Sequence, residues 1–291
     1  MPSLSPSELI LHPDGSIYHL HLHPEQVAPT IILVGDPERV PLVSRHFDRI
    51  EERVQKREFV THTGWRNDRR LSVVSTGIGT DNIDIVLNEL DALFNIDLRS
   101  REVKSELTQL DLIRIGTSGS LQPDLPVDSY LASGYGLGLE GLLHYYSLAN
   151  NAEETLIQLE LMRHAGQGFG FPLRPYLVGG SETLRQEIAY DFPTGITATC
   201  SGFYAPQGRQ LRLPSQQPDL LPHLRGFRYE SWRITNFEME TAGIYGLARL
   251  LGHRALSLNA LLANRVDQTF SPHPQRTVER LIEMTLERLS S

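Results

Sequence analysis

The chain has 291 residues, of which 40% are apolar and 21% charged, a composition that excludes a largely disordered protein. Its 35 acidic residues outnumber its 27 lysines and arginines, and the resulting formal charge of −8 argues against a nucleic-acid partner. The single cysteine, Cys200, excludes an internal disulfide, and no apolar run approaches the ~20 residues of a membrane span. Because the N-terminus lacks a signal-peptide pattern, we expect a cytoplasmic protein without a membrane partner.

Short apolar runs alternate with segments of helical periodicity along the chain. The apolar runs predict strands over 30–34, 57–63, 71–76, 111–116, 127–133, 175–178, 194–200 and 255–263. The helical spacing predicts a helix capped by Asp81 or Asn82 and running to Phe94, and helices over 153–164, 181–190, 241–251 and 275–289. Polar connections are predicted over 99–109, 117–120 and 201–213.

This alternation predicts an α/β fold with a mixed, mostly parallel central sheet and helices on both faces. No repeat and no long linker divides the chain, so we expect residues 1–291 to form a single domain. Ligands of such folds bind at the carboxyl ends of the strands. Those positions carry the segments GDPER (35–39), STGIG (75–79), IRIGTSG (113–119) and NFEMET (236–241).

Two arginines stand next to these glycine turns. Arg39 follows the first strand, and Arg114 lies within an otherwise apolar strand just before Gly116 and Thr117. The planar guanidinium suits phosphate or a carboxylate. Arg114 taken alone is equally compatible with a structural ion pair, but two arginines at two strand ends favour an oxyanion site.

Two further segments favour a small polar ligand. Glu238 and Glu240 stand at alternate positions, so both could face one pocket and accept hydrogen bonds from vicinal hydroxyls; a solvated acidic helix start is the alternative. In the FYAPQGR segment, Phe203 can stack on a flat heterocycle. Gln207 matches an amide-like edge, and Arg209 adds donors for a carbonyl oxygen.

The run HLHLH places His19, His21 and His23 on one face of a predicted extended strand, where three histidines could bind zinc. The absence of a nearby acid favours a strand edge or a ligand contact instead, so no metal is predicted. Cys200 is interpreted as a packed residue and not as a nucleophile, and the chain contains no Gly-x-Ser-x-Gly segment.

Eight segments, taken in order, resemble the nucleoside phosphorylase family, and within it the uridine phosphorylases. They are IYHL (17–20), GDPERV (35–40), REF (57–59), STGIG, IRIGTSG, FYAPQGR, NFEME and LLANR (261–265). The resemblance extends from Ile17 to the C-terminal helix. It implies the nucleoside phosphorylase fold, whose sheet is partly barrel-like, and a pentosyltransferase of pyrimidine salvage.

The resemblance also implies roles for individual residues. Phosphate would be bound by Gly35, Arg39, Arg114 and Thr117, with Arg57 reaching in from a neighbouring subunit. Ribose would be bound by Met239 and Glu240, with Glu238 close by and His19 of a neighbouring subunit at the 5′-hydroxyl. The base would be bound by Phe203, Gln207 and Arg209. The catalytic set would be Arg114, Gln207, Arg209 and Glu240.

The implied reaction uses inorganic phosphate as co-substrate, without an organic cofactor or a covalent enzyme intermediate. Arginines would place phosphate for attack on the anomeric carbon, and Gln207 and Arg209 would stabilise the departing uracil. In uridine phosphorylases this glutamine and arginine lie four and six positions after the phenylalanine, as they do here. Purine phosphorylases use an acid near the LLANR segment, where this chain has Asn264 and Arg265 and no acid before Asp267.

Several alternatives stay open. Deoxyuridine or thymidine could be the substrate, and the same fold also serves purine nucleoside phosphorylases and hydrolytic nucleosidases. A non-catalytic nucleoside-binding module is the alternative from another class. A hydrolase would not need Arg39, Arg57 and Arg114, and an inactive module should have lost some of them, whereas this chain keeps all three.

The resemblance implies an assembly of subunits with shared active sites. Because Arg57 and His19 would serve a neighbour's site, we expect a homodimer or a hexamer. In some bacterial members a serine after STGIG helps to bind an interfacial potassium ion. Here residues 80–82 are Thr, Asp and Asn, so an interfacial monovalent ion is left open.

Overall fold

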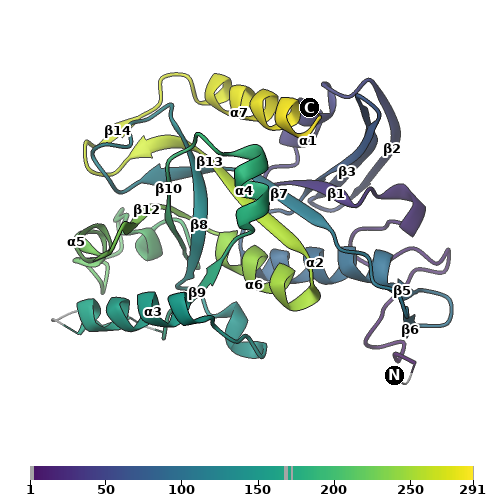
Figure 1. The fold of residues 1–291 in the computed structure, drawn as a ribbon, viewed down its shortest axis with the longest axis horizontal. Helices are drawn as coiled ribbons and strands as arrows, with labels where there is room; N and C mark the ends of the chain where they lie inside the picture. The colour runs from purple at the N-terminus through teal and green to yellow at the C-terminus, as the bar shows by residue number, and fades with distance from the viewer. Residues whose placement is uncertain (1–2, 167–169, 172, 291) are drawn as a thin grey trace.

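A computed structural model describes residues 3–166, 170–171 and 173–290 of the chain (Figure 1). The strands are β1 (Thr30–Val34), β2 (Arg49–Lys56), β3 (Phe59–Arg66), β4 (Arg69–Ser75), β5 (Ile96–Asp97), β6 (Glu102–Val103), β7 (Asp111–Ser120), β8 (Tyr130–Gly138), β9 (Tyr176–Gly179), β10 (Thr194–Thr199), β11 (Arg228–Tyr229), β12 (Trp232–Glu238), β13 (Arg254–Asn264) and β14 (Thr269–Phe270). The helices are α1 (Arg39–Ser44), α2 (Thr80–Asn95), α3 (Ala152–Ala165), α4 (Glu182–Ile188), α5 (Leu220–Gly226), α6 (Thr241–Leu251) and α7 (Pro274–Leu289).

Within the described residues, twelve strands form one sheet in the order β11-β12-β10-β8-β13-β7-β1-β4-β3-β2, with β9 on β8 and β14 on β13. Parallel pairing joins β1 to β4 and β7, β7 to β13, and β10 to β8 and β12. Strand β12 also pairs with β7, so the strands from β12 to β7 close on themselves. The predicted mixed α/β sheet of partly barrel-like form is confirmed.

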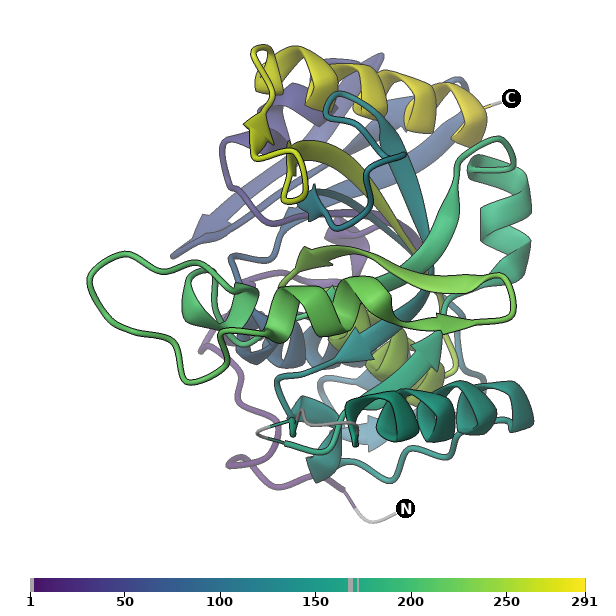
Figure 2. The same cartoon turned by 90° about the vertical axis from the view of Figure 1, so that its left-hand side faces the viewer.

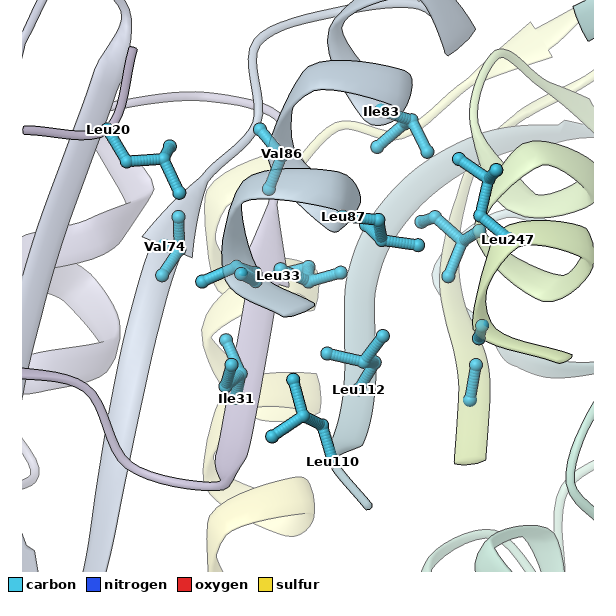
Figure 3. Close-up of a cluster of buried hydrophobic side chains, with 14 of the residues drawn as sticks. Leu20, Ile31, Leu33, Val74, Ile83, Val86, Leu87, Leu110, Leu112 and Leu247 are labelled. Atoms are coloured by element: carbon cyan, nitrogen blue, oxygen red, sulfur yellow. The ribbon is translucent and has the colours of Figure 1, made fainter. Parts of the chain in front are cut away.

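Strand β1 shows why helices cover both faces of the sheet. All five of its residues are buried, as the continuous apolar run predicts. Ile31 and Leu33 pack in a cluster with α2 and α6, and Figure 3 shows Leu33 beside Leu87 of α2, with Leu247 of α6 on the other side of Leu87. The alternate residues of β1 pack on the opposite face, in a cluster that includes side chains of α1 and α7. In Figure 1, α7 and α1 accordingly lie above the central strands, and α2 and α6 lie below them.

Most predicted elements are found close to their expected positions. Strand β1 and helix α6 have the predicted bounds, and α3 and α7 begin one residue earlier than predicted. Among the helices of the described residues, none combines the length and the apolar character that crossing a bilayer requires.

The strand predicted over 57–63 is displaced. Strand β3 begins at Phe59, and Arg57 lies in the tight turn that follows β2, with a left-handed φ of +54°. Strand β2 has no counterpart in the prediction because its residues alternate between exposed and half-buried positions and form no apolar run. The prediction that Arg57 begins a strand was therefore wrong.

Three other local predictions are corrected. Residues 117–120 continue β7 instead of forming a loop, because β13 pairs along one side and β12 along the other. Helix α2 starts after Gly79, whose φ of +96° ends the preceding extended segment, so neither Asp81 nor Asn82 is the cap. The HLHLH run is not a strand, and His21 has a left-handed φ of +55°.

Candidate active site

The carboxyl ends of the central strands open into a cavity of about 700 Å³. Its walls come from the segments after β1 and β4, the second half of β7, the connection from β10 to α5 and the junction of β12 with α6. Ten of the residues predicted from the sequence line it: Gly35, Arg39, Arg114, Thr117, Phe203, Gln207, Arg209, Glu238, Met239 and Glu240. The fold thus gathers residues from most of the length of the chain.

Arg114 is the most enclosed cation of the cavity, with 6% of its surface exposed. Its Nη2 donates to Glu240 Oε2 at 2.6 Å and lies 3.1 Å from Glu238 Oε2. Its Nη1 donates to Ser257 Oγ and Asn259 Oδ1 on β13, at 3.4 and 3.3 Å. Burial alone would lower the pKa of Arg114, but the charges of the two glutamates raise it overall. The guanidinium therefore stays charged inside the protein.

Glu238 and Glu240 are buried, so the alternative of a solvated helix start is wrong. Glu238 ends β12 and accepts hydrogen bonds from Thr199 Oγ1 (2.6 Å) and from the backbone N–H groups of Glu240 (2.8 Å) and Thr241 (2.9 Å). Glu240 precedes the first turn of α6 and accepts from the N–H of Gly79 at 2.8 Å. Burial, reinforced by the charge of Glu238, raises the pKa of Glu240. The cavity thus holds two close carboxylates against one buried arginine.

Arg39 reaches the cavity from the turn after β1, and its Nη1 donates to the carbonyl oxygen of Ile115 at 3.2 Å. Burial, and next the charge of Arg114, lower the pKa of Arg39. An anion bound beside both arginines would relieve this repulsion. Gly116 makes the arrangement possible, because the Arg114 side chain lies over it and a Cβ there would overlap the guanidinium. Thr117 follows on the same strand and lines the cavity.

The connection from β10 to α5 loops out from the body in Figure 2, yet Gln207 within it is buried. Arg209 Nη1 donates to Gln207 Oε1 (2.6 Å) and to the Phe203 carbonyl (2.7 Å), and its guanidinium lies 3.7 Å from the centre of the Phe203 ring. Burial, and next the charge of Arg265, lower the pKa of Arg209 to about 10. The three residues predicted to bind a base therefore form one connected unit.

Arg265 contacts the segment of Gln207, and the sequence analysis gave it no role, although it ends the LLANR segment. Its Nη1 and Nη2 donate to the carbonyl oxygens of Gln207 and Gly208 at 3.0 and 3.3 Å. Glu58 was also missed, and it lines the cavity from the turn between β2 and β3. Its place directly after Arg57 in the REF segment was the available signal.

Two predicted residues do not line the cavity. Arg57 is exposed in the turn between β2 and β3. His19 lies in the N-terminal segment, where its Nδ1 is 2.6 Å from Glu89 Oε1 on α2. The same carboxylate accepts from the backbone N–H groups of His19 and Leu20 at 3.0 and 2.8 Å. The expectation that no acid lies near these histidines was therefore wrong.

The remaining candidates for chemistry are placed outside the cavity. Among the residues that the structure describes, no three His, Cys, Asp or Glu side chains are grouped as ligands of a metal ion. Cys200 is 1% exposed, and burial raises the pKa of its thiol, in agreement with its interpretation as a packed residue.

Comparison with known proteins defines the class of protein to which this cavity belongs. Residues 29–289 match the phosphorylase superfamily, and the chain belongs to it. A uridine phosphorylase of Thermococcus kodakarensis is 32% identical over 260 residues, which cover 88% of this chain and 80% of the relative. A purine nucleoside phosphorylase of Clostridium perfringens is 26% identical over 275 residues, which cover 92% of this chain and 97% of the relative.

A solved structure extends the likeness to the whole fold. A nucleoside phosphorylase of Trypanosoma brucei, described as showing uridine phosphorylase activity, matches with a TM-score of 0.87 at 26% identity. The match covers 97% of this chain and 99% of that one, so the fold is that of the nucleoside phosphorylases. Enzymes of this family use inorganic phosphate as co-substrate and need no organic cofactor.

Proposed function

We propose that the protein cleaves uridine with inorganic phosphate to give uracil and ribose 1-phosphate. The observation that carries this proposal is that Arg114 and the Gln207–Arg209 pair line the same cavity. A buried arginine suits phosphate, and a glutamine beside an arginine suits the N–H and carbonyl groups of uracil. The likeness to the Thermococcus uridine phosphorylase supports the pyrimidine over the purine reading.

The proposed reaction is a single displacement. A phosphate oxygen forms a bond to C1′ of ribose while the bond from C1′ to N1 of uracil breaks. The electron pair of that bond passes to uracil, where it is spread over N1 and the two carbonyl oxygens, and uracil then takes up a proton. Arg39, Arg114 and Thr117 would hold phosphate, and Gln207 and Arg209 would stabilise the negative charge on uracil.

Ribose would be held between these two groups. The carboxylate of Glu240 would accept from the ribose hydroxyls, since each of its oxygens has a second lone pair beyond the bonds from Gly79 and Arg114. Met239 and Glu238 line the cavity on either side of it in the chain. Arg114 would then contact phosphate and Glu240 together, which would link the attacking group to the sugar.

The experiment that tests this function measures release of free base from uridine, thymidine and inosine, each with and without phosphate. Uracil release that depends on phosphate is the expected result. Release without phosphate would make the protein a nucleosidase, and release from inosine alone would make it a purine phosphorylase. Release from none of the three would favour the binding module.

We further propose that Arg57 and His19 complete the cavity of a second copy of the chain. Both lie outside their own cavity, and Arg57 is exposed. The test mixes two inactive variants, Arg57→Ala and Arg114→Ala, after dissociation and reassembly. Shared sites predict that activity reappears, because one site of a mixed dimer keeps both arginines. Activity that stays absent in mixtures, with each variant oligomeric, would contradict shared sites.

A further inference from the structure

A chain of buried hydrogen bonds starts at Arg114 and runs through the closed part of the sheet. Arg114 Nη1 donates to Asn259 Oδ1 at 3.3 Å, and Asn259 Nδ2 donates to Ser133 Oγ at 3.1 Å. A guanidinium has donors only, so the oxygen of Asn259 has to face it and the amide nitrogen has to face away. Asn259 and Ser133 are 0% and 1% exposed, so both are closed off from bulk solvent. The direction of these two bonds is therefore fixed by Arg114.

The direction passes on through two hydroxyl groups. Ser133 Oγ lies 2.5 Å from Thr197 Oγ1, and Thr197 Oγ1 donates to Asn236 Oδ1 at 2.8 Å. A hydroxyl has one hydrogen. Because the hydrogen of Thr197 goes to Asn236, the hydrogen between the two hydroxyls comes from Ser133. Thr197 and Asn236 are both 0% exposed.

This series of hydrogen bonds ends at the cavity where it began. Asn236 Nδ2 donates to Ser118 Oγ at 2.9 Å, and Ser118 lines the cavity. The hydroxyl hydrogen of Ser118 has no acceptor among the described residues, so it is left for a ligand oxygen. Every hydrogen bond from Arg114 to Ser118 thus runs in the same direction, and the donor character of arginine fixes its first step.

We propose that Asn259, Ser133, Thr197 and Asn236 are positioning residues, which hold the Arg114 guanidinium at one end and keep the Ser118 hydroxyl a donor at the other. The folded barrel does not need these groups for packing alone, since apolar side chains would fill the same space without buried polar atoms. The two carboxylates attract Arg114 from one side, and Asn259 holds Nη1 separately. The inference rests on the proposed function for its kinetic readout, but not for its binding readout.

The test removes one hydroxyl in the middle of the chain. Thr197→Val keeps the shape of the side chain but breaks the path, and Thr197→Ser restores the hydroxyl. The matched control is Thr63→Val, because Thr63 is also fully buried in the sheet and its Oγ1 lies 2.6 Å from Ser72 Oγ, away from the cavity. Thr197→Val should raise the KM for phosphate about fivefold with a smaller change in kcat, and the other two variants should keep the wild-type value.

Two additional measurements separate the possible failures. Ser133→Ala interrupts the series of hydrogen bonds with a small change in side-chain volume and should raise the KM for phosphate in the same way. This variant keeps the test available if Thr197→Val does not fold. Binding of inorganic phosphate to the free protein is measured by calorimetry for each folded variant. Equal phosphate affinity in Thr197→Val and Thr63→Val, or a Thr197→Ser variant as weak as Thr197→Val, would overturn the inference. If the wild-type protein binds phosphate but releases no base, the proposed reaction alone is overturned.

Discussion

Two pairs of an arginine and a buried glutamate lie at the opposite ends of helix α6. Glu240 stands directly before the first turn and pairs with Arg114, and Arg249 in the last turn pairs with Glu154 of α3. Both glutamates are at most 5% exposed. The two pairs are alike in residue type and in the burial of their glutamates, but their surroundings differ.

Glu154 is fully provided with donors. Its oxygens accept two bonds from Arg249, at 2.5 and 2.8 Å, and one each from the backbone N–H groups of Gly179 and Asn151. Burial alone would raise the pKa of Glu154, but these hydrogen bonds from Arg249, Gly179 and Asn151 lower it overall. The pair therefore acts as a fixed joint between α3, α6 and β9.

Glu240 shares its arginine with a second carboxylate. Glu238 lies 3.1 Å from the same Arg114 Nη2, and the pKa of Glu240 is raised. A buried carboxylate with a raised pKa beside a cavity is typical of a functional site, whereas a satisfied one is typical of a structural joint. The hydrogen-bond partners of the two glutamates, both of which are buried, thus distinguish the two pairs.

The two arginines should differ most in their effect on activity. Arg114→Ala should lower kcat/KM for phosphate by about a hundredfold or more, because it removes a buried donor from the anion site. Arg249→Ala should lower the melting temperature and leave the activity of the folded enzyme close to wild type. Initial rates at varied phosphate concentration, with thermal melts, test both variants. An unchanged KM for phosphate in Arg114→Ala would remove this arginine from the site.

For the free energy of unfolding, we expect Glu154 to matter more than Glu240. Glu154→Gln should lower the free energy of unfolding by about 2 kcal/mol, because a half-exposed Arg249 loses its two-pronged partner. Glu240→Gln should change it by less than about 1 kcal/mol, since the lost bond to Arg114 is offset by relief from Glu238. Urea unfolding measures both. A larger loss for Glu240→Gln would mean that the cavity pair is the structural one.

Gln207, a neutral residue of the cavity, should matter more for activity than for stability. Gln207→Ala should lower kcat/KM for uridine about thirtyfold, because the base loses the Gln207 amide and Arg209 loses one of its two acceptors. Its buried position predicts some loss of stability, smaller than the loss of activity. Gln210→Ala, an exposed glutamine of the same segment, is the control. Equal losses of stability and activity in Gln207→Ala would contradict its role in reading the base.

The smallest effect concerns pH. The pKa of Glu154 is lower in the folded than in the unfolded state, so its contribution to stability is present at neutral pH and is lost as the pH falls below the unfolded value of 4.5. The pKa of Glu240 is raised, so its contribution is present in acid and is lost as the pH rises through the folded pKa. Unfolding from pH 3 to 7 should show a shallower acid limb in Glu154→Gln alone. Parallel profiles for both variants and wild type would contradict the assignment.

The sequence predicted the elements whose signal is local. The apolar run of β1 and the helical spacing of α6 are visible in the chain itself, and both have the predicted bounds. Strand β2 was missed because its residues alternate between exposed and half-buried positions and so form no apolar run. The end of β7 was taken for a loop because its pairing with β12, far along the chain, decides that it is a strand.

The site was predicted to a similar degree. The cavity collects ten of the twelve predicted residues, because glycine-rich and polar segments at strand ends are recognisable in the chain. The contacts of Arg265 and Glu58 were not predictable, since Arg265 reaches the Gln207 carbonyl from the turn after β13 and Glu58 lines the cavity from a hairpin turn. Neither was the contact of His19 with Glu89, which depends on how the N-terminal segment lies on α2.

The backward fold of Arg114 over Gly116 has a consequence for reading related sequences. An arginine on a strand normally extends away from its backbone, and here it lies over the residue two positions on because that residue has no side chain. The pair Arg-x-Gly is therefore one structural unit. A protein that kept the arginine and replaced the glycine would carry the motif by letter, but its charge would point elsewhere.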